Sequence, residues 1–211
     1  MATLDELLAA NPVIPVVVVD SVEDGFNVGK ALLAGGITSA EVTFRTAAAP
    51  DAIKEMAKLE GLTVGAGTVI NANQARQAIE AGAQFVVSPG LSAEVVRYCQ
   101  EQNVPVLPAC TDGTHIMAAL DLGVETVKFF PATALGGIPT IKALSAPFPQ
   151  VRFVPTGGVS ASNLADFLSL KSVASCGGSW MVKGDLVKAG KWDEITRLSA
   201  EALEIARSVS A

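Results

Sequence analysis

The sequence is poor in the residues on which several classes of protein depend. Only 17% of its 211 residues are charged and no run of Lys or Arg occurs, so we expect no nucleic-acid partner. His115 is the only histidine, and no HxH or HExxH pattern is present. A metal-dependent enzyme needs several such ligands, so we expect no metal and no other cofactor.

Cysteines and long apolar runs are also scarce. Cys99, Cys110 and Cys176 form no CxxC pair, which favours reduced, buried thiols. The first residues are acidic and lack the apolar region of a signal peptide. The run Val13–Val19 contains a proline and is far too short to cross a bilayer. These features predict a soluble cytoplasmic protein with no membrane partner. Its net charge of -6 means that local donors would have to hold any anionic substrate.

What the sequence does have is apolar residues in a regular order. Half of its residues are hydrophobic, which is enough to bury a large core. Short runs rich in β-branched residues recur along the whole chain, with amphipathic, helix-like stretches between them. Eight runs are candidate strands: Val13–Val19, Ala40–Phe44, Leu62–Ala66, Phe85–Ser88, Val104–Pro108, Thr126–Phe130, Val151–Pro155 and Val173–Cys176.

This alternation predicts parallel strands joined by right-handed crossover helices. Eight units in so short a chain fit a closed barrel better than an open sheet. We therefore expect an α/β fold, a (β/α)8 TIM barrel formed as one domain by residues 1–211. The segment before Val13 is expected to be an additional N-terminal helix that plugs the barrel. In such barrels the chemistry lies at the carboxyl ends of the strands.

Lys128 is the most informative candidate for a reactive residue in these strand-like runs. It lies inside the apolar, strand-like run Thr126–Pro131, where burying an ammonium group is costly. One interpretation is that Lys128 ends a strand and reaches solvent. The other is that its amine, held uncharged in an apolar interior, attacks a carbonyl group to form a Schiff base.

Polar and apolar residues alternate in the segment Glu41-Val-Thr-Phe-Arg45. The period of a strand puts Glu41, Thr43 and Arg45 on one face, which we expect to point inward. Glu41 could then transfer protons and Arg45 could clamp a carboxylate. The alternative is a structural ion pair between Glu41 and Arg45.

The third candidate strand ends in Gly65-Ala-Gly-Thr68. A tight turn is a sufficient explanation for the two glycines. At the mouth of a barrel they would also let the backbone approach a ligand, and the Thr68 hydroxyl could then donate to a carboxylate.

Two glycine pairs follow the last two candidate strands. They lie in Pro155-Thr-Gly-Gly-Val159 and in Cys176-Gly-Gly-Ser-Trp180. Each pair alone could serve a turn. Because barrel enzymes often bind phosphate after their seventh and eighth strands, both together predict a phosphate site built from backbone N–H groups.

These segments stand in an order that resembles a known family. The chain is similar to the class I aldolases of the Entner–Doudoroff pathway that act on 2-keto-3-deoxy-6-phosphogluconate (KDPG) or 4-hydroxy-2-oxoglutarate (KHG). The motifs that carry the resemblance are Glu41–Thr46, Gly65–Val69, Ser88–Gly90, Val127–Ala132, Pro155–Gly158 and Gly177–Trp180.

The resemblance implies a homotrimer and a set of residue roles. Its substrates would be a keto acid and a phosphorylated aldehyde. Motif matching makes Lys128 the imine lysine and Glu41 the general acid and base. The carboxylate would bind Arg45 and Thr68. The phosphate site would consist of Thr156, Gly157, Gly158, Gly178 and Ser179.

Two segments depart from the family pattern. The stretch Ala109–His115 and the residue Thr133 differ from what the family commonly has there, which leaves substrate preference open.

The sequence thus predicts a carbon–carbon lyase that cleaves KDPG to pyruvate and glyceraldehyde 3-phosphate. It would also cleave KHG to pyruvate and glyoxylate. Two alternatives stay open: another phosphate-binding barrel enzyme, such as an isomerase or synthase, and a non-catalytic barrel that binds phosphorylated metabolites.

Overall fold

The computed structural model describes residues 3–210, so the ends of the predicted domain, Met1, Ala2 and Ala211, lie outside it. Eight short parallel strands occur close to the predicted runs. The eighth begins where its predicted run ends. The strands are β1 (Val13–Val17), β2 (Ser39–Thr43), β3 (Thr63–Gly67), β4 (Phe85–Val87), β5 (Val106–Leu107), β6 (Thr126–Phe129), β7 (Arg152–Pro155) and β8 (Cys176–Gly178).

The prediction of a closed eight-stranded TIM barrel is wrong. Six strands form one parallel sheet in the order β5-β4-β3-β2-β1-β8, and β6 and β7 form a separate two-stranded sheet. Isolated bridges alone connect the two sheets, at Ala109–Lys128 on one side and at Phe153–Val173 and Thr156–Gly177 on the other. The fold is therefore a curled α/β sheet with two breaks in its hydrogen-bond ladder.

A proline explains each break. On the β5 side, Lys128 donates to the Pro108 carbonyl and accepts from the Cys110 amide, both at 2.9 Å. The next donor toward β6 would be Pro108, which has no N–H group. On the β8 side, Phe153 donates to Ser172, and the next donor in that direction would be Pro155. On each side a proline occupies the next donor position, so no continuous ladder forms. On the β8 side a separate second bridge follows at Thr156–Gly177.

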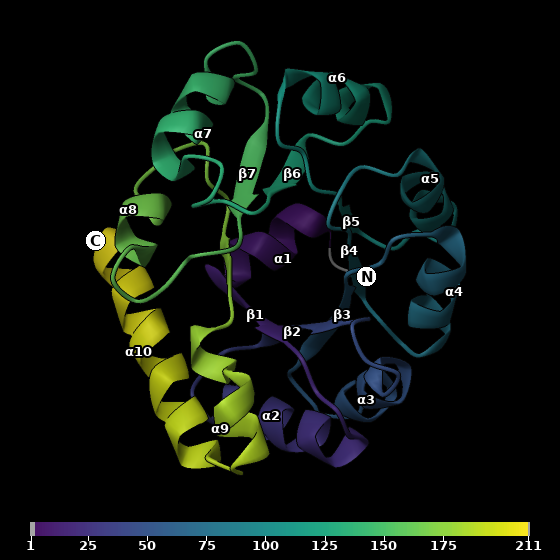
Figure 1. Cartoon of the computed structure of the whole chain (residues 1–211), viewed down its shortest axis with the longest axis vertical. Coiled ribbons are helices and arrows are strands. Elements are labelled where there is room, and N and C mark those ends of the chain that lie inside the picture. The colour runs from purple at the N-terminus through teal and green to yellow at the C-terminus, as the bar shows by residue number, and fades with distance from the viewer. Residues whose placement is uncertain (1–2, 211) are drawn as a thin grey trace.

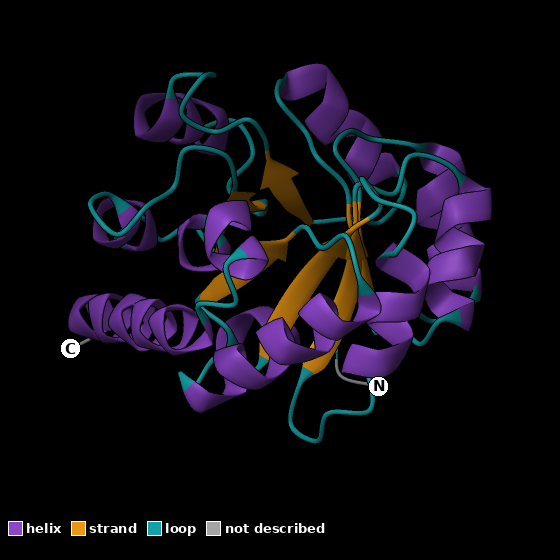
Figure 2. Ribbon diagram, turned by 60° about the horizontal axis from the view of Figure 1, so that its bottom comes forward, coloured by secondary structure: helices purple, strands orange, loops and turns teal. Residues whose placement is uncertain are grey.

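Helices surround the strands on the outside (Figure 1), and the strands converge at the centre in the turned view of Figure 2. The amphipathic patterns marked most of these helices, although α7 and α9 were not expected. The helices are α1 (Leu4–Ala10), α2 (Val22–Ala34), α3 (Ala49–Met56), α4 (Ala72–Glu80), α5 (Ala93–Glu101), α6 (Gly113–Asp121), α7 (Gly137–Ser145), α8 (Leu164–Leu168), α9 (Gly184–Lys188) and α10 (Trp192–Ser210), with a 3-10 turn η1 (Trp180–Val182). Within residues 3–210, no helix is both long and apolar enough to cross a membrane.

Helix α1 closes the space inside the strands at one end. A capping box between Thr3 and Glu6 starts this helix. Its residues Leu7 and Leu8 are buried in an inner apolar cluster with strand residues that include Phe85. Figure 1 shows α1 lying across the centre of the strands. Helix α1 thus fills the end of the strands opposite to their carboxyl ends.

Candidate functional site

The centre of the site is a buried pair of opposite charge. Lys128 Nζ on β6 lies 3.2 and 3.3 Å from the two carboxylate oxygens of Glu41 on β2. The side chains are only 6% and 5% exposed, although they come from the two separate sheets. The interpretation in which Lys128 reaches solvent is therefore wrong. Among the described residues Glu41 pairs with Lys128 and forms no ion pair with Arg45.

Strand alternation and a glycine together position this pair. Val127 and Phe129 of β6 pack outward into the main apolar core, which turns Lys128 inward. Gly67 of β3 lies beside Glu41, and an added Cβ there would overlap the Glu41 carboxylate. Taking two charges out of water is costly, so a pair held so deep in the fold is weak evidence for a stabilising role. Function is the better explanation.

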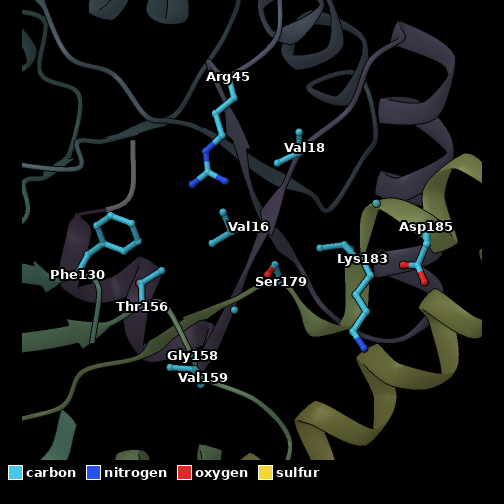
Figure 3. A pocket seen from close by; sticks show the side chains of 14 residues that line it. Val16, Val18, Arg45, Phe130, Thr156, Gly158, Val159, Ser179, Lys183 and Asp185 are labelled. Atoms are coloured by element: carbon cyan, nitrogen blue, oxygen red, sulfur yellow. The ribbon is translucent and has the colours of Figure 1, made fainter. Parts of the chain in front are cut away.

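A cavity of about 590 Å³ opens at the carboxyl ends of the strands. Figure 3 shows Arg45, Phe130, Thr156, Gly158, Ser179 and Lys183 around it. Six predicted site residues line this cavity: Arg45, Thr156, Gly157, Gly158, Gly178 and Ser179. Lys128 and Glu41 lie buried below it. Phe130 lies between the cavity and the buried pair, because its ring lines the cavity and the ring centre is 5.5 Å from Lys128 Nζ.

The glycine loop after β7 presents free donors to this cavity. Gly157 and Gly158 have φ values of 92° and 80°, which side-chain-bearing residues rarely adopt. The carbonyls of Thr156 and Gly157 are engaged by the amides of Ala132 and Thr133, at 2.8 and 3.1 Å. By contrast, within residues 3–210 the Gly158 amide donates no hydrogen bond, and neither do those of Val159 and Ser179. Unpaired N–H groups at the wall of a cavity are suited to bind an anion.

Thr68 is the one predicted binding residue that neither lines this cavity nor joins the buried pair. It follows β3 and is half-buried, with a φ of 57°. A β-branched residue rarely adopts this left-handed conformation, so the surrounding structure has to impose it.

Lys183 and Asp185 line the cavity and were missed by the sequence reasoning. The motif that marked the second glycine pair ended at Trp180. The 3-10 turn of Trp180–Val182 then brings Lys183 back to the cavity wall. The sequence signal for Lys183 is its position only a few residues after the predicted phosphate site.

The segment Ala109–His115, which departs from the family pattern, forms a helix cap outside this cavity. Asp112 caps α6, and its second carboxylate oxygen lies 2.8 Å from His115 Nδ1. Burial, helped by the Asp112 carboxylate, raises the pKa of the Cys110 thiol to about 12, so it is no nucleophile at neutral pH. The described residues contain no group of three or more His, Cys, Asp or Glu placed to hold a metal ion.

Fold and site together define a class: an α/β protein with a buried lysine–carboxylate pair beneath a cavity lined by unpaired backbone amides. The family model of KDPG and KHG aldolase matches residues 4–198. The KHG/KDPG aldolase of Escherichia coli is 45% identical over 204 residues, which is 96% of each chain. The chain belongs to the KDPG and KHG aldolase family, and it is a carbon–carbon lyase.

Two solved structures of this family are similar throughout. The KDPG aldolase of Legionella pneumophila, with pyruvate captured as a covalent carbinolamine, superposes with a TM-score of 0.92 at 40% identity. The match covers 95% of this chain and 98% of that one. The KDPG aldolase of Zymomonas mobilis with 3-phosphoglycerate has a TM-score of 0.91 at 41% identity, with 98% of both chains covered.

Proposed function

We propose that this protein cleaves KDPG to pyruvate and glyceraldehyde 3-phosphate through a Schiff base on Lys128, and KHG to pyruvate and glyoxylate by the same steps. The observation that carries the proposal is the buried contact of 3.2 Å between Lys128 and Glu41. An amine must be uncharged to attack a carbonyl. Glu41 is the only carboxylate described within ion-pair distance of Lys128, and it can take the ammonium proton.

The steps follow from this arrangement. Proton transfer to Glu41 frees the amine of Lys128, which attacks C2 of the keto acid. Loss of water leaves an iminium that draws electrons from the C3–C4 bond. Glu41, now a carboxylate again, removes the proton of the C4 hydroxyl, and the aldehyde departs. Protonation of the enamine at C3 and hydrolysis of the imine release pyruvate and restore Lys128.

Arg45, Thr68 and the cavity wall hold the two ends of the substrate in this proposal. Arg45 lines the cavity, so its guanidinium binds the C1 carboxylate, with help from the Thr68 hydroxyl. The phosphate binds at the opposite wall to the amides after Thr156 and beside Gly178. Lys183 adds a cation at this wall, which offsets both the nearby Asp185 and the net charge of -6.

Lys183→Ala is expected to raise KM for KDPG by about tenfold and to leave KM for KHG, which has no phosphate, within about twofold. Steady-state kinetics on both substrates checks this. Lys188→Ala is the matched control, because Lys188 is an exposed lysine of the neighbouring α9 that pairs with Asp20 and does not line the cavity. An equal rise in KM for both substrates would show that Lys183 does not bind the phosphate.

A coupled assay of pyruvate release tests the function itself. KDPG and KHG, together with other 2-keto-4-hydroxy acids, should yield pyruvate, and chelators should not slow the reaction. Binding of KDPG without any release of pyruvate would favour the non-catalytic alternative. Conversion of a phosphorylated sugar without pyruvate would favour an isomerase or synthase.

We also infer a homotrimer in the cytoplasm. The family resemblance supports the trimer, and Ile70 and Met117, 59% and 60% exposed, leave apolar surface for contacts between subunits. Three free, buried cysteines suit a reducing compartment. Light scattering is expected to give three times the 21.6 kDa mass of the chain. A monomer at assay concentration would contradict the trimer, and activity in a membrane or secreted fraction would contradict the location.

A further inference from the structure

Thr43 has a buried hydroxyl that nothing in the fold explains. The residue is 1% exposed, and its Oγ1 has no hydrogen-bond partner among the described residues. A buried, unpaired hydroxyl destabilises the fold because it has lost its bonds to water and gained none in return. Such a group in a native site calls for a missing partner that enters the interior.

The position of Thr43 points to that partner. Strand alternation puts Thr43 on the same face as Glu41, one inward position nearer the carboxyl end of β2. Arg45, the next residue of this face, lines the cavity. Thr43 therefore lies between the level of the buried Lys128–Glu41 pair and the level of the cavity wall.

The neighbours of Thr43 leave its hydroxyl without a partner. Its partner in register on β3 is Gly67, and the Glu41 carboxylate occupies the place that a side chain of Gly67 would take. On the other side, Val18 follows the Val17–Val42 pair and lines the cavity. The hydroxyl of Thr43 makes no hydrogen bond to this carboxylate or to any other described group, so it is available to an atom bound above Glu41.

We propose that Thr43 holds the oxygen on C2 of the substrate while Lys128 forms the imine. This inference rests on the proposed Schiff-base function. Along β2, Thr43 lies about 7 Å from Glu41 toward the cavity. A substrate whose C2 is bonded to Lys128 and whose adjacent carboxylate is held by the long side chain of Arg45 therefore lies beside Thr43. The carboxylate lies at the outer, exposed level of Arg45, so the buried hydroxyl faces the C2 oxygen.

The step can be written in full. After the amine attacks, C2 carries an OH group and the nitrogen of Lys128. The protonated carboxyl of Glu41 gives its proton to that oxygen, the C2–O bond breaks, and water leaves. The lone pair of the nitrogen forms the C2=N bond, and Glu41 becomes a carboxylate. Thr43 donates a hydrogen bond to the departing oxygen and keeps it in line with Glu41.

Ser39 provides a matched control on the same strand face. It is also buried, and its Oγ also lacks a partner among residues 3–210, but it lies at the opposite end of β2 from the cavity. Removing either hydroxyl removes an unpaired polar group, so neither Thr43→Val nor Ser39→Ala should lower the melting temperature. Only the first should affect catalysis.

The experiment measures imine formation directly, as the rate at which borohydride inactivates the enzyme in the presence of pyruvate. Thr43→Val is expected to slow this rate and kcat by about tenfold, whereas Thr43→Ser stays within about threefold and Ser39→Ala equals the unmodified enzyme. Thr43→Ala serves as a second variant without the hydroxyl, should the valine disturb the fold.

The two hypotheses fail in different ways. A folded Thr43→Val or Thr43→Ala enzyme with the unmodified rate of imine formation would overturn the role of Thr43. Equal losses for Thr43→Ser and Thr43→Val would also overturn it, since the serine keeps the hydroxyl. If the unmodified enzyme is not inactivated by borohydride and pyruvate, the Schiff-base function itself fails.

Discussion

Lys128→Arg is expected to lower kcat for KDPG cleavage by at least about 10⁴-fold while the protein stays folded. Arginine keeps a positive charge beside Glu41, so the buried pair of the unmodified protein is not simply broken. Its guanidinium stays protonated and cannot form the imine. Loss of activity in this variant therefore reports on the chemistry of the amine and not on the charge.

Steady-state release of pyruvate and thermal unfolding together check this expectation. Lys128→Met provides the contrast, because it removes both the amine and the charge and leaves the Glu41 carboxylate buried without a partner. We expect it to be equally inactive but less stable than the arginine variant. Residual turnover above about 1% in either folded variant would mean that another residue carries the chemistry.

Glu41→Gln has the second largest expected effect, a fall in kcat of about 10²–10⁴-fold. Glutamine has nearly the same shape but can neither take the proton of Lys128 nor remove that of the C4 hydroxyl. Lys128 keeps a hydrogen-bond partner, so the fold should survive. KM should change little, because Glu41 lies below the cavity wall that binds the two ends of the substrate.

The control for this variant is the trapping of pyruvate on Lys128. Imine formation should be slower in Glu41→Gln but should still modify the same lysine after long incubation. A variant that cleaves KDPG within about threefold of the unmodified rate would exclude Glu41 as the group that moves protons.

Much of the fold could be predicted because hydrophobic periodicity marks each element locally. Strand candidates such as Thr126–Phe130 agree with β6 to within one residue. Closure of the barrel could not be predicted from strand counting, because it depends on hydrogen bonds between strands that are distant in sequence. Pro108 and Pro155 were visible signals against it, since a proline cannot donate within a ladder. That one domain comprises the whole chain stays a prediction.

The site was predictable where one strand carries several groups. The alternation in Glu41-Val-Thr-Phe-Arg45 set the inward face of β2, and Lys128 stood out against an apolar run. Lys183 was not predictable in the same way, because a 3-10 turn and not a strand places it at the cavity. The unpaired hydroxyl of Thr43 needed the structure, since burial without a partner leaves no mark in a sequence.

The most direct measurement is to treat the enzyme with pyruvate and borohydride and to map the modified peptide by mass spectrometry. Borohydride reduces an imine to a stable amine, so one pyruvate-derived group should be found on the peptide that contains Lys128. Neither the Lys128→Arg nor the Lys128→Met protein should acquire it. A label on a different lysine, or no label under conditions where the enzyme cleaves KDPG, would contradict the Schiff base on Lys128.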